Sequence, residues 1–277
     1  MKFVVCGEAL IDLLPEPGGP GNRWQALAGG GPMNTAVALG KLGCDVHFLG
    51  RLGPDAFGRQ IRRHLLDSGV QLDLAVAAPE PTSLAVVSLG VDGKAEYTFH
   101  FDNTSNFVWQ AAEFPQLDAD TWLHFGSVGA VVGSGAKAVC DFVAGTAATV
   151  SYDINVRPTV QPDRDRYFAD VADLMAAVGS GAGIVKASDD DINWLVDDDE
   201  PVAYAQAWAA EYGLAMFIVT LGEHGAVAVK PDGRELRVPG RTVEVADTVG
   251  AGDTFMAGFL AQYLRDPADL ELALTHG

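Results

Sequence analysis

Residues 246–259 read ADTVGAGDTFMAGF and combine a glycine-rich turn with the start of a helix. Three residues with little or no side chain stand in the middle: Gly250, Ala251 and Gly252. From Phe255 onward, apolar residues recur at three- and four-residue spacing, which predicts an amphipathic helix. The first N–H groups of a helix lack partners within it, so small residues there let an anion approach the backbone. We expect an anion site, with Asp253 as a base that takes a proton from a hydroxyl; alternatively, Thr248 or Asp253 only caps the helix.

Apolar runs alternate with helical patterns along the rest of the chain. This alternation predicts βαβ units, a mainly parallel sheet and one main α/β domain. The expected strands are residues 3–7, 46–50, 122–126, 149–153, 183–187 and 216–220. The expected helices are residues 32–42, 57–68, 166–178 and 202–212.

Residues 82–101 break this alternation and predict a hairpin. Asp92 and Gly93 supply the turn, and alternate residues fall on one strand face, namely Ala95, Tyr97, Phe99 and Phe101. Residues 23–27 are also extended, and we expect them to pair with the hairpin in a small lid sheet. The aromatic face either packs on its own domain or covers a substrate or a second subunit.

Composition excludes several classes of protein. The 277 residues include 37 acidic and 18 basic residues, so the formal charge of −19 disfavours binding to nucleic acid or an anionic membrane. The cysteines Cys6, Cys44 and Cys140 form no CxxC pair, which is typical of a reduced compartment. No apolar run approaches membrane-spanning length, and Glu8 and Asp12 interrupt the only segment that resembles a signal peptide. We expect a cytoplasmic protein.

A second glycine-rich stretch, AGGGPMN at residues 28–34, also leads into a helix. The glycine backbone and Asn34 suit neutral hydroxyl groups better than phosphates, although a plain helix-initiating loop is the alternative. Asp12, after the first strand, is a carboxylate able to accept two sugar hydroxyl hydrogen bonds, or an ordinary loop residue.

These two motifs, at opposite ends of an α/β chain, resemble those of the ribokinase-type (PfkB) carbohydrate kinase family. The resemblance covers nearly the whole chain and rests on Gly29-Gly30-Gly31-Pro32-Met33-Asn34 and Asp247-Thr248-Val249-Gly250-Ala251-Gly252-Asp253. It implies a Rossmann-like three-layer α/β fold, with residues 1–277 as one domain and a β lid from about 12–27 and 82–108. It also implies transfer of the γ-phosphoryl group of ATP to a sugar hydroxyl.

The resemblance assigns roles to individual residues. Asp253 corresponds to the catalytic base, and the anion hole consists of Gly250, Ala251 and Gly252. The sugar contacts are Asp12, Gly30, Gly31 and Asn34, to which we add the lid residues Tyr97 and Phe99 and the nearby Arg157. The ATP-binding positions are Lys186, Ser188, Thr220, Gly222 and Gly225. Magnesium corresponds to Asp191, through water, and potassium to Asp247 and Val249.

The chain departs from the family pattern in two places. The family's Asn-x-x-Glu motif appears as Ser188-Asp189-Asp190-Asp191, so a shorter carboxylate stands at the magnesium position. A solvated acidic helix start is the alternative interpretation there. The chain ends at LALTHG, and we expect the last helix and strand of the family fold to be missing after residue 277.

The opening GEALID and the segment SYDINVRPT are similar to the fructokinase branch, which favours fructose as substrate. The alternatives are 2-keto-3-deoxygluconate kinase, ribokinase and, from another class, a sugar-binding protein without catalysis. A nicotinamide-dependent enzyme and a P-loop enzyme are excluded because neither GxGxxG after the first strand nor GxxxxGK[ST] occurs. We expect a homodimer formed through the lid.

Overall fold

The computed structural model describes residues 1–16, 23–89, 95–241 and 249–277, and within them the main sheet has eight strands. Their order is β14-β13-β12-β11-β10-β9-β1-β4. All neighbours from β4 to β12 are parallel, whereas β13 and β14 are antiparallel. The strands are β1 (Lys2–Cys6), β4 (Val46–Leu49), β9 (Thr121–Gly126), β10 (Thr149–Asp153), β11 (Ile184–Ser188), β12 (Met216–Thr220), β13 (Ala226–Val229) and β14 (Glu235–Val238). The six expected strands are the six parallel ones.

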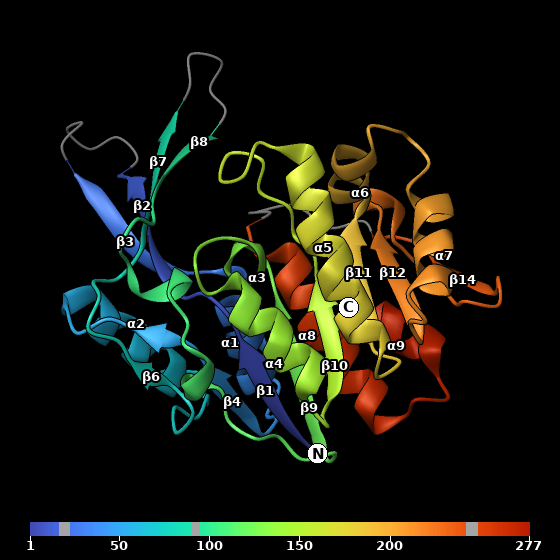
Figure 1. The fold of residues 1–277 in the computed structure, drawn as a ribbon, viewed down its shortest axis with the longest axis horizontal. Coiled ribbons are helices and arrows are strands. Elements are labelled where there is room, and N and C mark those ends of the chain that lie inside the picture. The colour runs from blue at the N-terminus through green and yellow to red at the C-terminus, as the bar shows by residue number, and fades with distance from the viewer. Residues whose placement is uncertain (17–22, 90–94, 242–248) are drawn as a thin grey trace.

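Helices cover both faces of this sheet (Figure 1). One face carries α1 (Gly31–Lys41), α2 (Ala56–Asp67), α8 (Ala251–Arg265) and α9 (Leu270–His276). The other carries α3 (Val128–Val131), α4 (Ala136–Gly145), α5 (Arg164–Gly179), α6 (Asp189–Val196) and α7 (Pro201–Glu211). Successive side chains of a strand point to opposite faces, so Val4 joins one hydrophobic core while Phe3 and Val5 join the other. This confirms the predicted three-layer α/β fold.

A second sheet of four strands rises from one end of the main body (Figure 1). Its order is β3-β2-β7-β8, with β2 (Leu10–Pro15), β3 (Trp24–Gly29), β7 (Leu84–Leu89) and β8 (Ala95–His100). β7 and β8 form the expected hairpin, whose predicted turn at Asp92 and Gly93 lies outside the described residues. On β8, the ring of Phe99 lies 5.9 Å from Tyr97 and 4.8 Å from Phe101, so the aromatic residues share one face as expected.

One expectation about the strand pairing in this lid was wrong. Residues 24–29 do not pair with the hairpin; they pair with β2, which lies between β3 and β7. Strands joined by a short connection pair antiparallel most readily, so the apolar segment LIDLLP became the partner of β3. Asp12 lies after the first strand, within the lid strand β2.

The base of the lid is held by the buried Asn106, in the short 3₁₀ helix η1 (Ser105–Phe107). Its amide nitrogen donates to Ala9 O and to Ser83 Oγ, both at 2.9 Å, and its oxygen accepts from Ala9 N at 3.2 Å. Three segments that enter or leave the lid are thus joined at one side chain.

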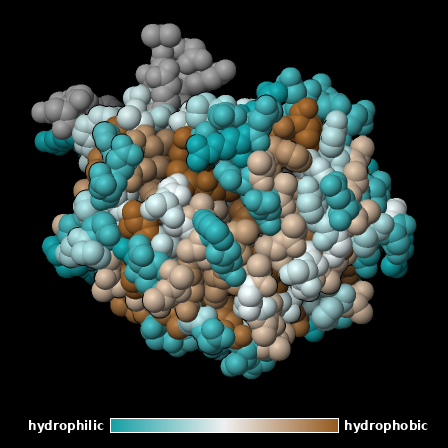
Figure 2. All heavy atoms as spheres, viewed as in Figure 1, coloured by the Kyte–Doolittle hydropathy of each residue, from teal (hydrophilic) through white to brown (hydrophobic). Residues whose placement is uncertain are grey.

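The remaining short elements are β5 (Arg51–Leu52), β6 (Val76–Ala77), η2 (Ala111–Glu113) and η3 (Gly222–His224). Over the described ranges, no helix combines the length and apolar character needed to cross a membrane. The face seen in Figure 2 is mostly hydrophilic, with hydrophobic residues interspersed.

Candidate active site

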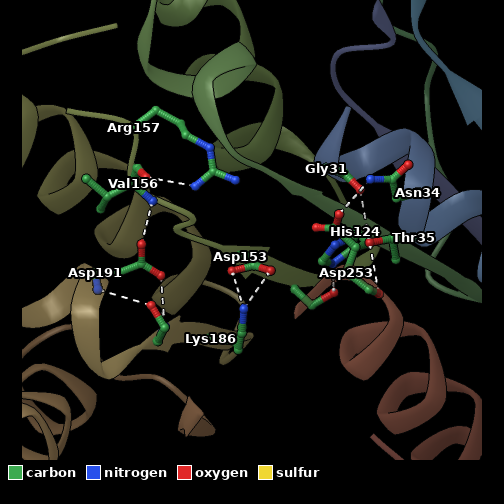
Figure 3. Close-up of polar contacts among 12 residues, drawn as sticks. Gly31, Asn34, Thr35, His124, Asp153, Val156, Arg157, Lys186, Asp191 and Asp253 are labelled. Atoms are coloured by element: carbon green, nitrogen blue, oxygen red, sulfur yellow. Dashed lines mark hydrogen bonds and ion pairs between the residues drawn. The ribbon is translucent and has the colours of Figure 1, made fainter. Parts of the chain in front are cut away.

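The predicted site residues gather where the parallel strands end. Carboxyl ends of parallel strands meet at one edge of a sheet, and open α/β folds bind their ligands there. Figure 3 shows Asp253 and Asn34 on one side, Asp191 and Arg157 on the other, and Lys186 with its partner between them. The two glycine-rich helix starts are far apart in sequence, but both belong to this site because α1 packs along α8.

The start of α8 has the form expected of an anion site. Gly250 is its N-cap in the left-handed region (φ 75°), and Ala251 and Gly252 begin the first turn. The N-cap glycine has no side chain that could cap α8, and the hydrogen bond given for the Asp253 carboxylate comes from Asn34 and not from the first turn. The other capping candidate, Thr248, lies outside the described residues. Gly250, Ala251 and Gly252 have little or no side chain, so an anion can approach the backbone at this helix start, as predicted.

Asp253 is a buried carboxylate with one firm partner. It is 7% exposed, and Asn34 Nδ2 donates to its Oδ2 at 2.9 Å. Burial raises the pKa of Asp253, while the Asn34 hydrogen bond and the charges of Lys186 and Arg157 oppose that rise. Such a carboxylate is a stronger base than an exposed aspartate. Among the described residues, no hydrogen bond is given to its second oxygen, Oδ1, which is the oxygen we expect to meet a substrate hydroxyl.

Lys186 brings positive charge to the start of α8. Its Nζ lies 3.0 Å from Asp153 Oδ2, and both side chains are buried. Burial acts to lower the pKa of Lys186, but the carboxylates around it, Asp153 foremost, raise it overall, so the ammonium stays charged. A β-carbon on Gly252 would lie 2.8 Å from that Nζ. The cation therefore sits directly against the backbone of the predicted anion hole.

The expected sugar-binding residues face this base from α1 and the lid. A β-carbon on Gly31 would lie 3.2 Å from Asp253 Oδ1 and 2.9 Å from Asn155 Nδ2. Gly30 has φ 119°, which favours glycine, and Asp12 packs against the neighbouring Gly29. Burial raises the pKa of Asp12 to about 6, and the charge of Arg157 opposes that rise. Backbone, carboxylate and amide groups thus converge beside Asp253, as recognition of hydroxyls requires.

A small hollow beside Asp253 contains residues that sequence reasoning did not assign. It is lined by Gly31, Pro32, Thr35, His124, Gly126, Ser127, Asp153, Asn155 and Asp253. Ser127 and Asn155 both have positive φ, at 60° and 44°, a backbone conformation that is uncommon for residues other than glycine. His124 is buried with Nδ1 2.9 Å from Ser151 Oγ, and burial lowers its pKa to about 3, so it is neutral. The available signal was position, because Ser127 directly follows one predicted strand and Asn155 lies two residues after the end of another.

Arg157 and the lid aromatics lie at the margin of the site. Arg157 is exposed, and its Nη1 donates to Val156 O at 2.8 Å. Its positive charge opposes the rise that burial causes in the pKa of Asp12 and of Asp253. Tyr97 and Phe99 lie on β8 and not among the residues that line the hollow. Their contact with substrate stays a prediction.

Asp191 is engaged by backbone groups. Its Oδ1 accepts from Val156 N and its Oδ2 from Ser188 N, both at 2.8 Å, and Ser188 Oγ accepts from Asp191 N in a capping box at the start of α6. In the described part of the chain, no group of three or more His, Cys, Asp or Glu side chains is arranged to hold a metal ion. A role of Asp191 toward magnesium would therefore pass through water, using the remaining lone pairs of the carboxylate.

The other predicted ATP and potassium positions lie near the ends of β12 and α8. Thr220 ends β12, and Gly222, with φ 54°, faces open space, so a planar ligand has room along this turn. Gly225, with φ 94°, packs tightly against the backbone of Val238, where a side chain would not fit. Val249 is 64% exposed, and Asp247 lies outside the described residues.

The comparisons with known proteins agree with this geometry. Residues 1–277 match the family described as pfkB family carbohydrate kinase. The protein belongs to this family. It is therefore a carbohydrate kinase, and the resemblance inferred from its two motifs is confirmed.

The pfkB relatives and structures that this chain is similar to cover most of its length. A fructokinase of Rhizobium leguminosarum bv. trifolii is 35% identical over 269 residues, spanning 95% of this chain and 80% of that protein. The structure of a Vibrio cholerae O395 fructokinase in apo form has a TM-score of 0.85 at 26% identity and covers 99% of this chain and 94% of that one. An aminoimidazole riboside kinase from Salmonella enterica, complexed with aminoimidazole riboside and an ATP analog, also has a TM-score of 0.85, at 25% identity, covering 100% of this chain and 90% of that one.

Proposed function

We propose that this pfkB-family protein is an ATP-dependent fructokinase that transfers the γ-phosphoryl group of ATP to a primary hydroxyl of fructose. The observation that carries this proposal is the buried Asp253, oriented by Asn34 at the open start of α8, with Lys186 against the same turn. The choice of fructose is supported by the fructokinases among the relatives. Sugar binding without catalysis does not require a buried carboxylate in the first turn of a helix, so this arrangement favours a kinase over a sugar-binding protein.

In the proposed reaction, Asp253 Oδ1 accepts the proton of the fructose hydroxyl as that oxygen bonds to the γ-phosphorus and the bond to the ADP oxygen breaks. Asn34 holds the other carboxylate oxygen and so fixes the direction of Oδ1. The free N–H groups at the start of α8 and the Lys186 ammonium stabilise the charge on the transferring group. Asp191 would hold magnesium through water, and the ion supplies further positive charge near the phosphates when bound.

The direct test is release of ADP from MgATP, with potassium added. The acceptors are fructose, ribose, 2-keto-3-deoxygluconate, fructose 6-phosphate and aminoimidazole riboside, with Asp253→Asn as the control for the base. We expect fructose-dependent release that falls by about 100-fold or more in Asp253→Asn, with fructose affinity retained. Near-normal turnover by Asp253→Asn would contradict the assignment of the base.

Other outcomes of the same panel separate the alternatives. Activity on another acceptor would keep the mechanism and change the substrate. Calorimetric binding of a sugar, with no binding of ATP under any magnesium or potassium condition, would favour the inactive sugar-binding protein.

Two further proposals concern the lid and the location of the protein. The lid carries exposed apolar side chains, Trp24 at 44% and Leu27 at 41%, which supports a homodimer formed through the lid. Light scattering that finds only monomer would exclude that dimer. A cytoplasmic location is supported by the three unpaired cysteines, and cell fractionation tests it.

A further inference from the structure

Glu8, two residues after the end of β1, has a buried carboxyl group that the proposed mechanism does not use. It is 2% exposed, and glutamate is rarely found so deep without partners. Its Oε2 accepts from Gly129 N at 3.2 Å, and Ser127, two residues before Gly129, stands at the start of the same turn. Glu8 thus connects the end of β1 with the turn that follows β9.

The backbone of Glu8 touches the opposite wall of the site. A β-carbon on Gly30 would lie only 2.6 Å from Glu8 O, so the glycine loop of the sugar site packs directly on this residue. The next residue, Ala9, is held through both its N–H and its C=O by Asn106. The backbone around Glu8 is therefore held in place, and from there the Glu8 side chain reaches the backbone N–H of Gly129.

The turn that Glu8 holds borders the reacting groups. Ser127, with φ 60° and ψ −162°, adopts a conformation that needs support from its surroundings. Its N–H donates to Asp153 O at 3.0 Å, and its Cβ would lie 3.4 Å from a β-carbon placed on Gly31. Ser127 and Asp253 line the same hollow, so a shift of the turn changes the space beside the base.

We propose that Glu8 is a positioning residue that holds the turn of residues 127–129 against the glycine loop and thereby sets the width of the sugar pocket. This inference rests on the proposed sugar kinase function. Ser127 lies against Gly31 and lines the same hollow as Asp253, whereas the predicted ATP residues lie on β11, at the end of β12 and in the turn after β12. A displaced turn therefore changes recognition and orientation of the sugar and leaves ATP binding intact.

The test compares Glu8→Ala with Glu8→Gln. In Glu8→Ala, the Gly129 N–H loses its acceptor, and we expect KM for fructose to rise and kcat to fall, together lowering kcat/KM by about 10- to 100-fold. KM for ATP stays within about twofold. Glutamine keeps a side-chain oxygen that accepts from Gly129, so Glu8→Gln retains most of the activity. The assays are run at a temperature below the unfolding transition of each variant, and circular dichroism checks that each variant is folded at that temperature.

A second substitution approaches the same contact from the other side. In Gly129→Ala, the new β-carbon would lie 2.7 Å from Glu8 Oε2, so we expect the same rise in KM for fructose. The matched control is Gly145→Ala at the end of α4, where nothing lies within 4 Å of the new β-carbon and no kinetic change is expected. Unchanged fructose constants in folded Glu8→Ala, or an equal loss in Glu8→Gln, would overturn the proposal.

Hydrogen exchange separates this proposal from the proposed function. Exchange at the Gly129 amide needs no substrate, and we expect it to become about tenfold faster or more in Glu8→Ala but not in Glu8→Gln. An unreactive wild-type protein with this pattern would refute the kinase proposal and leave the Glu8 link in place. An active wild-type protein with unaltered exchange in Glu8→Ala would refute the link alone.

Discussion

Replacing Asn34 by alanine tests whether this residue acts through Asp253 or contacts the sugar alone. The structure places Asn34 Nδ2 2.9 Å from Asp253 Oδ2, in a site where the carboxylate is 7% exposed. A hydrogen bond to a charged group contributes about 1.5–3 kcal/mol, which corresponds to about a 10- to 150-fold loss in kcat/KM. The bond also lowers the pKa of Asp253, so its removal raises that pKa.

The two roles of Asn34 predict different pH profiles. If Asn34 holds the base, less Asp253 is ionised at a given pH in Asn34→Ala, so the acid limb of the kcat/KM profile moves to higher pH. The loss is then greatest at low pH and shrinks as pH rises, because the remaining carboxylate is a stronger base. The assay is fructose-dependent ADP release between about pH 5.5 and 9.

The control for Asn34→Ala is Gln206→Ala, which removes another side-chain amide donor, bonded to Lys230 O at 2.6 Å on the distant helix α7. We expect no change of profile in this variant. A loss that is independent of pH and confined to KM for fructose would refute the reasoning and reduce Asn34 to a sugar contact.

Three further predictions concern the anion hole and the buried charges. Gly252→Ala places a β-carbon 2.8 Å from Lys186 Nζ, so it should lower kcat and the affinity for ATP. Fructose affinity, measured by calorimetry, should stay unchanged, and weaker fructose binding would contradict this prediction. Lys186→Met leaves the buried Asp153 carboxylate without its ion-pair partner and should lower the unfolding free energy, measured in urea, by about 3–5 kcal/mol. Adding Asp153→Asn to Lys186→Met should restore most of this loss. A double variant that is no more stable than Lys186→Met would be inconsistent with the ion pair. Burial raises the pKa of Glu8 from 4.5 to about 7 and that of Asp153 from 3.8 to about 6, so between about pH 4 and 7 the folded state binds more protons and stability decreases as pH rises. The melting temperature should accordingly fall between pH 5 and 7.5, less steeply in Glu8→Gln, and a rise across that range would reverse the sign of the argument.

The sequence alone determined the layers of the fold and the two helix starts of the site. Hydrophobic periodicity is local, so the six parallel strands and the helices between them followed from short segments. The glycine stretches at the starts of α1 and α8 likewise predicted a close approach of backbone and ligand, and Asp253, beside the second stretch, indicated a base. These features depend on neighbours within a few residues.

Only the tertiary structure decided which side chains meet. Asn34 and Asp253 are 219 residues apart, and Glu8 and Gly129 are 121 apart, so no local pattern connects them. The apolar segment at 10–15 pairs with β3, which follows it in the chain, and also with β7, which is far from it in sequence and which no local pattern identifies as a partner. Parallel strands bring distant loops to one edge of the sheet, and their order in that sheet is a long-range property that selects which loops face each other.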